Sequence, residues 1–422
     1  MKIAVVGGGS TYAPELLHGL AEGAEALALD AVTLYDIDEP RLAVVGDFCR
    51  RMVARQTERT QLTTTTTLEA AVDGADFVVV QIRVGGQAAR LEDERLGLDH
   101  GVIGQETTGV GGFSKALRTV PVLLDIARRT QRVAPNATLI NFTNPVSIVT
   151  EALLQHADIT TIGLCNIPLS QRMEIAAHLG VSPAEVEIDS VGLNHLSFVR
   201  GVRVNGEERL GDLLEDVAKL LDSGHKPANL PDLDFPPELL RALGMIPSDY
   251  LRYYYLHPDT VAEQRAAEQL RAQQVMAIED ELLAYYADPQ NDERPELLSQ
   301  RGGAFYSHAA LEIIRAITLD EPARLIVDTQ NGDTVRELPA GACVEVPCNV
   351  RANGATPLPQ APLPAEIRGL IQHVKAYEEL TVRAALSGTW QDVYLAALNH
   401  PLTPSAQVAK SVADRLSSRD PR

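Results

Sequence analysis

The sequence predicts an α/β fold in which a doubly wound parallel sheet is followed by an α+β second domain. Residues 1–165 alternate between apolar, strand-like segments and helix-like segments, a pattern typical of parallel strands covered by helices on both faces. From about residue 186 the pattern changes to paired strand-like segments and long helical runs. At 422 residues the chain also exceeds one ordinary hydrophobic core. We therefore expect a first domain over 1–165, a second over 166–416 and a flexible tail over 417–422.

The expected elements of the first half follow this alternation in chain order. Its strand-like segments are rich in Val, Ile, Leu and Thr, as buried parallel strands are. Strands are expected at 3–8, 31–37, 63–67, 76–82, 138–144 and 159–165, with one helix after the first strand and others at 41–56 and 68–75.

The second half combines hairpin-like and helical segments. Residues 186–208 read as antiparallel strands that turn at Asn205-Gly206, because Asn-Gly favours the tight turns of hairpins. A further strand is expected within 340–354. Long helices are expected at 262–286 and 365–388, and a proline-rich loop at 227–237.

A glycine-rich turn ends the first expected strand. Gly7 and Gly9 follow an apolar run and precede Ser10 and a helical segment. Glycines at such a turn let backbone N–H groups approach a pyrophosphate, which then lies at the positive end of the helix. Asp36 ends the second strand, where a carboxylate binds an adenosine ribose hydroxyl. These residues predict a Rossmann-like site for NAD, not NADP, although the usual third glycine is missing.

The acidic composition excludes one class of partner. The formal net charge is −20, so nucleic acid would be repelled, and a bound phosphate must meet a local cluster of arginines. No apolar stretch reaches the length of about 18 residues that a membrane span needs. With four cysteines that read as free thiols and no leader segment, the chain is expected to be cytoplasmic.

Two residues on different segments are candidate metal ligands. Cys165 ends an apolar strand at the sheet edge that faces a bound nucleotide, and His195 lies early in the second half. A thiolate and an imidazole can share a metal whose other positions are filled by water or substrate oxygens, and ligand softness alone favours zinc or iron. Taken singly, each residue is as readily a packed core side chain.

Arginines, amides and tyrosines complete the candidate site. Arg83 and Arg90 flank a glycine pair after one strand, and Arg271 lies in a long helical run; guanidinium groups gathered in this way suit a phosphate monoester. The glycine-rich segment 104–112 is interpreted as a flexible loop that closes over a ligand. The segment NFTNP supplies amides suited to vicinal sugar hydroxyls. In DYLRYYYL, a tyrosine beside a metal ion and an arginine can act as a base.

In this order the motifs resemble glycoside hydrolase family 4, the NAD- and metal-dependent glycosidases, and most closely its 6-phospho-β-glucosidases. The likeness covers nearly the whole chain. It implies a fold with the architecture of lactate and malate dehydrogenases. The motifs are IAVVGGGSTYAPELL, YDIDEPR, GLDHGVIGQETTGVGGFS, NFTNP, GLCNIP, GLNHLSF, YLRYY and VEVPCNVR.

The resemblance implies a role for each candidate residue. Cys165 and His195 would ligate a divalent metal, usually manganese, and Tyr250 would be the base, with Tyr254 as the alternative. By the same motifs Asn144 and Asn166 would contact sugar hydroxyls, and Arg83 and Arg271 the 6-phosphate. The resemblance also separates two subgroups, because phospho-α-glucosidases have an aspartate acid where this chain has Asn166.

The hypothesis that fits these parts is hydrolysis of 6-phospho-β-glucosides by transient oxidation at C3, deprotonation at C2, elimination of the aglycone, water addition and re-reduction. The substrate would be a phosphorylated disaccharide or aryl glycoside. Long amphipathic helices in the second half favour a homo-oligomer, a dimer or tetramer. The alternatives are a family 4 enzyme for α-galactosides, α-glucuronides or phospho-α-glucosides, a 2-hydroxy-acid dehydrogenase, and a non-catalytic NAD sensor.

Overall fold

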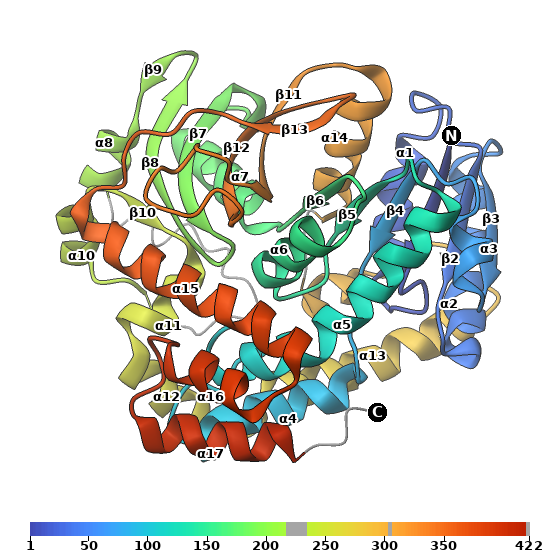
Figure 1. Ribbon diagram of the computed structural model, residues 1–422. Coiled ribbons are helices and arrows are strands. Elements are labelled where there is room, and N and C mark those ends of the chain that lie inside the picture. Colours follow the sequence, from blue (N-terminus) through green and yellow to red (C-terminus); the bar gives the residue numbers. More distant parts are fainter. Residues whose placement is uncertain (217–233, 303–305, 419–422) are drawn as a thin grey trace.

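One mixed β-sheet runs through the whole molecule (Figure 1). In the computed structural model, which describes residues 1–216, 234–302 and 306–418, thirteen strands of the described chain form this sheet. The order is β10-β8-β7-β12-β11-β6-β5-β4-β1-β2-β3, with β13 beside β12 and β9 beside β8. Strands from the first half and from the second half of the chain therefore belong to one hydrogen-bonded sheet.

The first half forms the predicted parallel sheet. Its strands are β1 (Lys2–Val6), β2 (Ala31–Tyr35), β3 (Gln61–Thr65), β4 (Phe77–Val80), β5 (Thr138–Asn141) and β6 (Thr161–Gly163). They lie in the order 3-2-1-4-5-6, and all their pairings are parallel. This is the dinucleotide-binding order. The strands are added to one side of β1 as far as β3 and to its other side from β4 onwards, and this change of side leaves a crevice at the carboxyl edge between β1 and β4. The predicted doubly wound fold is confirmed.

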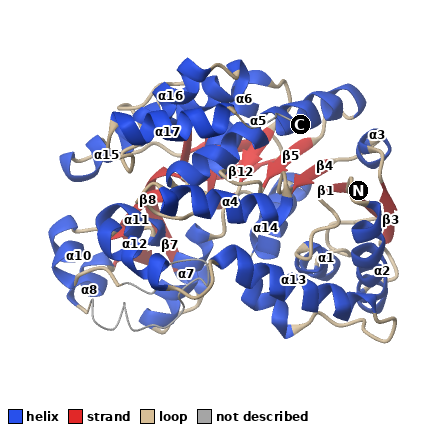
Figure 2. Ribbon diagram, turned by 90° about the horizontal axis from the view of Figure 1, so that it is seen from below, coloured by secondary structure: helices blue, strands red, loops and turns tan. Residues whose placement is uncertain are grey.

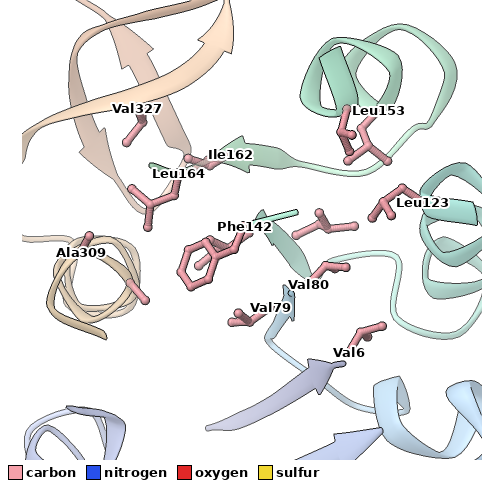
Figure 3. Packing of buried hydrophobic residues seen from close by; sticks show 14 of the residues in the cluster. Val6, Val79, Val80, Leu123, Phe142, Leu153, Ile162, Leu164, Ala309 and Val327 are labelled. Carbon is pink, nitrogen blue, oxygen red and sulfur yellow. The ribbon is translucent and has the colours of Figure 1, made fainter. Parts of the chain in front are cut away.

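Helices cover both faces of this sheet, as Figure 2 shows. One face carries α1 (Ala13–Glu22), α2 (Glu39–Gln56), α13 (Arg271–Ala287) and α14 (Tyr306–Leu319), and the other carries α3 (Leu68–Val72), α5 (Gly109–Val133) and α6 (Val146–His156). Figure 3 shows the core between them, where Val79 and Ile162 of the sheet lie between Leu123 of α5 and Ala309 of α14. Val327, beyond β6, belongs to the same buried cluster, so the core is continuous across the sheet.

The second half extends the sheet with antiparallel strands. These are β7 (Val186–Leu193), β8 (Leu196–Val204), β9 (Glu207–Glu208), β10 (Ile246–Pro247), β11 (Ala323–Gln330), β12 (Cys343–Arg351) and β13 (Gly354–Pro357). The predicted turn at Asn205-Gly206 is confirmed, and both residues have positive φ there, 52° and 86°. A second tight turn, which was not predicted, joins β7 to β8.

The remaining helices surround the carboxyl edge and the outer end of the sheet. They are α4 (Gly86–Asp99), α7 (Ile167–Leu179), α8 (Leu210–Glu215), α10 (Pro237–Leu243), α11 (Arg252–Tyr255), α12 (His257–Ala266), α15 (Ala365–Ser387), α16 (Trp390–Leu398) and α17 (Ala406–Ser417). No helix in the described part of the chain combines the length and apolarity that crossing a bilayer requires.

The prediction of one helix over 262–286 is wrong, because the chain breaks between α12 and α13. Ala267 and Leu270 adopt extended backbone conformations. The side chain of Gln264 binds both the backbone N–H and the carbonyl of Gly104, at 2.8 and 3.2 Å, which ties the end of α12 to another segment. The break makes Arg271 the first residue of α13.

The segment 104–112 is not the exposed loop that its glycines predict. Gln105 and Glu106 are buried, and the segment becomes the first turn of α5 at Gly109. A Cβ on Gly111 would lie 2.1 Å from the carbonyl oxygen of Gln105, so glycine serves close packing here. Most of the proline-rich loop expected at 227–237 and of the expected tail lies outside the described residues, although Pro237 begins α10.

Candidate active site

The glycine turn and Asp36 meet at the carboxyl ends of β1 and β2. The N–H of Gly9 donates to Asp36 Oδ2 at 2.9 Å, and a Cβ on Gly9 would lie 2.9 Å from the same oxygen. Gly7 has a φ of +92°, and a Cβ there would lie 2.8 Å from the carbonyl oxygen of Gln81. Only glycine fits this turn, and Ser10 Oγ accepts the N–H of Tyr12 at 3.2 Å as the helix α1 begins. The arrangement fits a dinucleotide phosphate cradle.

Two arginines that sequence reasoning missed hold this turn. Arg41 Nε donates to the carbonyl of Gly9 at 2.8 Å, and Arg301 Nε donates to Thr11 Oγ1 at 2.7 Å. Both guanidinium groups pair with Glu279, at 2.9 and 3.0 Å. Three distant segments make these contacts, so the local sequence carries no signal for them.

Strand register brings Cys165 and His195 together. Cys165 follows β6, whose Gly163 pairs with Asp328 of β11, and β11 and β12 place Glu345 between Asp328 and Gly192 of β7. His195 lies in the turn after β7 with a φ of 63°. Cys165 Sγ and His195 Nε2 are 3.6 Å apart, and both side chains are buried.

The electrostatics of this pair suit ligands of a cation. Burial and the ammonium of Lys115 lower the pKa of His195 to about 3, so the imidazole is neutral and its nitrogen lone pair is available. Burial and the Glu345 charge raise the pKa of the Cys165 thiol, so a bound metal ion would have to displace its proton.

The donor set leaves room for other ligands. Within the described residues no group of three or more His, Cys, Asp or Glu side chains is placed to hold a metal ion. Cys165 and His195 are therefore a two-residue set, which fits a divalent cation whose remaining positions are filled by water or by substrate oxygens.

Tyr250 lies directly on the histidine. Its ring is parallel to the imidazole of His195, with the centroids 3.5 Å apart and an interplanar angle of 7°. Burial, together with the nearby Cys165, raises the pKa of Tyr306 at the start of α14 well above its usual range. The alternative tyrosine, Tyr254, stacks instead against His400 at 6.4 Å. Of the two candidate bases, Tyr250 is the one stacked on a candidate metal ligand.

The two asparagines extend from the ends of neighbouring strands. Asn144 follows β5 and Asn166 follows β6, which pair in parallel through Asn141 and Gly163. Asn144 Oδ1 is buried and has no hydrogen-bond partner. Asn166 Oδ1 lies 3.9 Å from Cys165 Sγ. An orphaned amide oxygen at this edge is free to accept a hydrogen bond from a ligand hydroxyl.

A buried cluster of charges surrounds Glu106. Arg83 binds this carboxylate through both of its terminal nitrogens, Lys115 Nζ lies 2.7 Å from it, and Arg90 Nε lies 3.4 Å away. Burial would raise the pKa of Glu106, but the three cations outweigh burial and hold that pKa well below its usual range. Lys115 and Glu106 were both missed from the sequence, although Glu106 lies in the motif GLDHGVIGQETTGVGGFS and Lys115 directly follows it.

Arg271 joins the same cluster through the start of α13. The N–H of Ala272 donates to Glu94 Oε2 at 3.0 Å, and Glu94 pairs with Arg90 at 2.8 Å. The charges of Arg90 and Glu106 act on Arg271, and its Nε is buried without a partner. Four cationic side chains thus face two carboxylates, Glu94 and Glu106. Burial lowers the pKa of Lys115 to about 7, so the three guanidinium groups supply most of the positive charge, which suits an anionic ligand such as a phosphate monoester.

The charge cluster adjoins the Cys165 and His195 pair. Thr107, the residue after Glu106, places its Oγ1 3.3 Å from His195 Nδ1. The charges of Lys115 and Glu106 both act on His195. A nucleotide turn, a pair of soft metal donors with a tyrosine, and a phosphate-sized cationic cluster therefore lie on one edge of one sheet. Fold and site together define a protein of the dinucleotide-binding class, with a candidate cation site and a candidate anion site at the same sheet edge.

Comparison with known proteins identifies the family. Residues 2–181 match the model of family 4 glycosyl hydrolases, and residues 190–403 match that of the family 4 glycosyl hydrolase C-terminal domain. The chain belongs to this family. The resemblance drawn from its motifs is confirmed. The chain is therefore not assigned to the family of 2-hydroxy-acid dehydrogenases.

The relatives of 37–39% identity are named 6-phospho-β-glucosidases, whereas a 6-phospho-α-glucosidase of Leptotrichia buccalis is 30% identical over 98% of this chain and 96% of that protein. A probable 6-phospho-β-glucosidase of Bacillus subtilis is 37% identical over 425 residues, 99% of this chain and 95% of that protein. The structure of a Thermotoga maritima 6-phospho-β-glucosidase with manganese, NAD⁺ and glucose-6-phosphate superposes with a TM-score of 0.90 at 37% identity, over 99% of this chain and 97% of that one.

The predicted dehydrogenase-like architecture is also confirmed. Malate dehydrogenase of Cryptosporidium parvum superposes with a TM-score of 0.56 over 92% of this chain and 99% of that chain. At 15% identity this likeness shows the shared fold alone.

Proposed function

We propose that this chain hydrolyses 6-phospho-β-glucosides with the help of NAD⁺ and a divalent cation, Mn²⁺ by analogy with its relatives. The observation that carries the proposal is the junction at Thr107. On one side of it lie Cys165 and His195, 3.6 Å apart, and on the other lies the cationic cluster around Glu106. A sugar whose phosphate meets the cluster would present its ring hydroxyls to the cation.

Each candidate residue has a binding role in this proposal. Gly7, Gly9 and Ser10 would hold the pyrophosphate of NAD, and Asp36 the adenosine ribose. The exposed side chain of Ile37, next to Asp36, offers an apolar contact for the adenine base.

The substrate would be held at both ends. Arg83 and Arg271 would bind the 6-phosphate through charge-assisted hydrogen bonds, with Lys115 as a further donor. Asn144 and Asn166 would bind sugar hydroxyls, and Cys165 and His195 would ligate the cation. A phosphorylated disaccharide or aryl glycoside satisfies all of these contacts.

The reaction we propose depends on a general base that removes the proton at C2 of the sugar. The chemistry that the bound groups supply is reversible hydride transfer at C3 of the sugar and Lewis acidity at the oxygens on C2 and C3. Tyr250 removes the proton at C2, which the neighbouring ketone makes acidic, and the aglycone leaves by elimination before water adds to C1. Burial of Cys165, His195 and Tyr250 keeps bulk water away from these steps.

The β-anomer is favoured by one residue and by the relatives. Asn166 cannot give a proton to a leaving alkoxide, whereas the family resemblance implies an aspartate at this position in the phospho-α-glucosidases. The named β-specific relatives are also 37% identical to the chain over nearly its full length.

One assay tests the proposal directly. Full-length protein is given 4-nitrophenyl β-glucoside-6-phosphate or its α-anomer, each with and without NAD⁺ and Mn²⁺. We expect nitrophenol release from the β-anomer only when both cofactors are present, without net formation of NADH. Equal or faster release from the α-anomer would assign another specificity, and accumulation of NADH would assign a dehydrogenase.

The same proposal places the enzyme in the cytoplasm, where thiols stay reduced. All four cysteines are free and buried, which suits a reducing compartment. Assembly into a homodimer or homotetramer remains a prediction.

A further inference from the structure

Glu345 is a buried carboxylate beside the two candidate metal ligands, and no catalytic or binding role described above uses it. It lies in β12, is 1% exposed, and pairs across the sheet with Gly192 of β7. A glutamate this deeply buried is rare unless its carboxylate is paired or otherwise compensated. We therefore asked what its two oxygens do.

Both oxygens of Glu345 hold the turn that carries His195. Asn194 Nδ2 donates to Oε2 at 3.0 Å, and Ser197 Oγ donates to Oε1 at 2.9 Å. Asn194 and His195 are the two residues between β7 and β8, and His195 has the uncommon positive φ of 63°. Two hydrogen bonds to one fixed carboxylate therefore set the conformation of a strained two-residue turn.

The turn also faces the other candidate ligand, since Cys165 Sγ lies 3.6 Å from His195 Nε2. Asn194 directly precedes His195, so its hydrogen bond links Glu345 to the imidazole through the backbone. A displacement of Glu345 would therefore change the distance between the two candidate donor atoms.

Glu345 has no cationic side chain opposite it. Within the described residues its hydrogen-bond partners are the Asn194 amide and the Ser197 hydroxyl, and no Lys or Arg forms an ion pair with it. By contrast, buried Glu151 lies 2.6 Å from Lys375 Nζ. The hydrogen bonds to the turn are therefore the contacts that hold the Glu345 carboxyl group.

We propose that Glu345 is a positioning residue for the metal centre: through its hydrogen bonds to Asn194 and Ser197 it fixes the turn of His195, and so holds the imidazole in place relative to Cys165. This inference rests on the proposed function, because it takes Cys165 and His195 as the ligands. Outer carboxylates that orient ligands in this way typically contribute 10–100-fold to metal affinity.

The test measures metal binding, not turnover. Co²⁺ is titrated into full-length, metal-free protein with NAD⁺ present, and the thiolate-to-cobalt absorption band and the Kd are recorded. Glu345→Gln, which keeps the side-chain shape, is expected to weaken Co²⁺ binding about 10–100-fold and to shift or weaken the band. The matched control Glu151→Gln changes an equally buried glutamate that does not touch the turn, and its Kd is expected to stay within about twofold.

Two further variants make every outcome decisive. Asn194→Ala breaks the link while leaving Glu345 bonded to Ser197, and it should weaken binding in the same range even if Glu345→Gln fails to fold. Cys165→Ala should abolish the thiolate band. Loss of the band in Cys165→Ala with unchanged Kd in Glu345→Gln and Asn194→Ala would overturn the positioning role alone. A band that survives in Cys165→Ala would instead overturn the metal site of the proposed function.

Discussion

The phenol ring of Tyr250 lies parallel to the imidazole of His195 at a centroid distance of 3.5 Å. This contact joins a candidate base to a candidate metal ligand. Tyr254 stacks instead against His400, with the ring centroids 6.4 Å apart. The stack makes the choice between the two tyrosines testable.

Tyr250→Phe keeps the stacked ring and removes only the hydroxyl. We expect kcat for the phosphorylated β-glucoside to fall about 10²–10⁴-fold, the usual contribution of a general base, with KM changed little. Tyr254→Phe, its matched control, should stay within about threefold of the wild type. Steady-state rates with substrate deuterated at C2 check the step, since proton abstraction should show an isotope effect. A larger loss in Tyr254→Phe would reassign the base.

Removal of the metal should abolish activity, and recovery of activity with Mn²⁺ should require Cys165. After chelation, Mn²⁺ is expected to restore the wild-type rate, but to restore less than about 1% of it in Cys165→Ala, because one of two protein donors is missing. Cys49→Ala provides the control, since Cys49 is a free, buried thiol in α2 that is not a candidate metal ligand. Full recovery of Cys165→Ala by Mn²⁺ would remove the cysteine from the ligand set.

Arg271→Ala tests the phosphate site. Loss of one charge-assisted contact costs about 1.5–3 kcal/mol, so KM for the 6-phosphorylated substrate should rise about 10–150-fold. The unphosphorylated glycoside should be affected less than about threefold. Arg315→Ala, on the exposed side of α14, should change neither value. Equal effects of Arg271→Ala on the two substrates would place this arginine outside the phosphate site.

Lys375 holds two buried carboxylates between α6 and α15. Its Nζ lies 2.6 Å from Glu151 and 2.5 Å from Glu378. Lys375→Met leaves both charges buried without a counter-ion, and we expect a loss of about 3–5 kcal/mol in the free energy of unfolding. Denaturant unfolding measures this loss, and adding Glu151→Gln to the variant should recover part of it. A loss below about 1 kcal/mol would show that the carboxylates are neutral in the folded protein.

Glu174 should make stability depend on pH. Burial, helped by the Asp249 carboxylate and opposed by Arg252, raises the pKa of Glu174 from 4.5 to about 8. The folded chain therefore keeps a proton that the unfolded chain releases, so this contribution to stability is present below pH 4.5 and is lost as the pH rises to about 8. In Glu174→Gln the fall in melting temperature between pH 5 and 8 should be smaller. An unchanged pH profile would contradict the shift.

Local pattern was enough to predict the first half of the fold. Alternation of apolar runs with helical segments predicts parallel strands, and the glycine turn at Gly7 marks β1, so the dinucleotide-binding order follows. The joining of the two halves into one sheet could not be predicted, because it depends on pairings such as Gly163 with Asp328, far apart in the chain. The break before Arg271 likewise depends on Gln264 binding Gly104, a tertiary contact.

In the candidate site, too, the residue types could be predicted from local sequence, whereas their spatial arrangement could not. Cys165 and His195 stand out by residue type, but their approach depends on the register of β6, β11, β12 and β7. Lys115 reads in sequence as an ordinary surface lysine of a helix, and only the fold shows that it is buried against Glu106. Charged residues inside glycine-rich segments were the one local signal that could have marked this cluster.

The shared sheet makes the two halves of the chain dependent on each other. A fragment that ends after β6 would leave the unpaired edge of that strand open to solvent, where it could pair with other copies and aggregate. It would also separate the thiol from the imidazole. Expression of the first half alone is therefore expected to lose both solubility and the candidate active site, because the strand pairings that complete the sheet also bring Cys165 and His195 together.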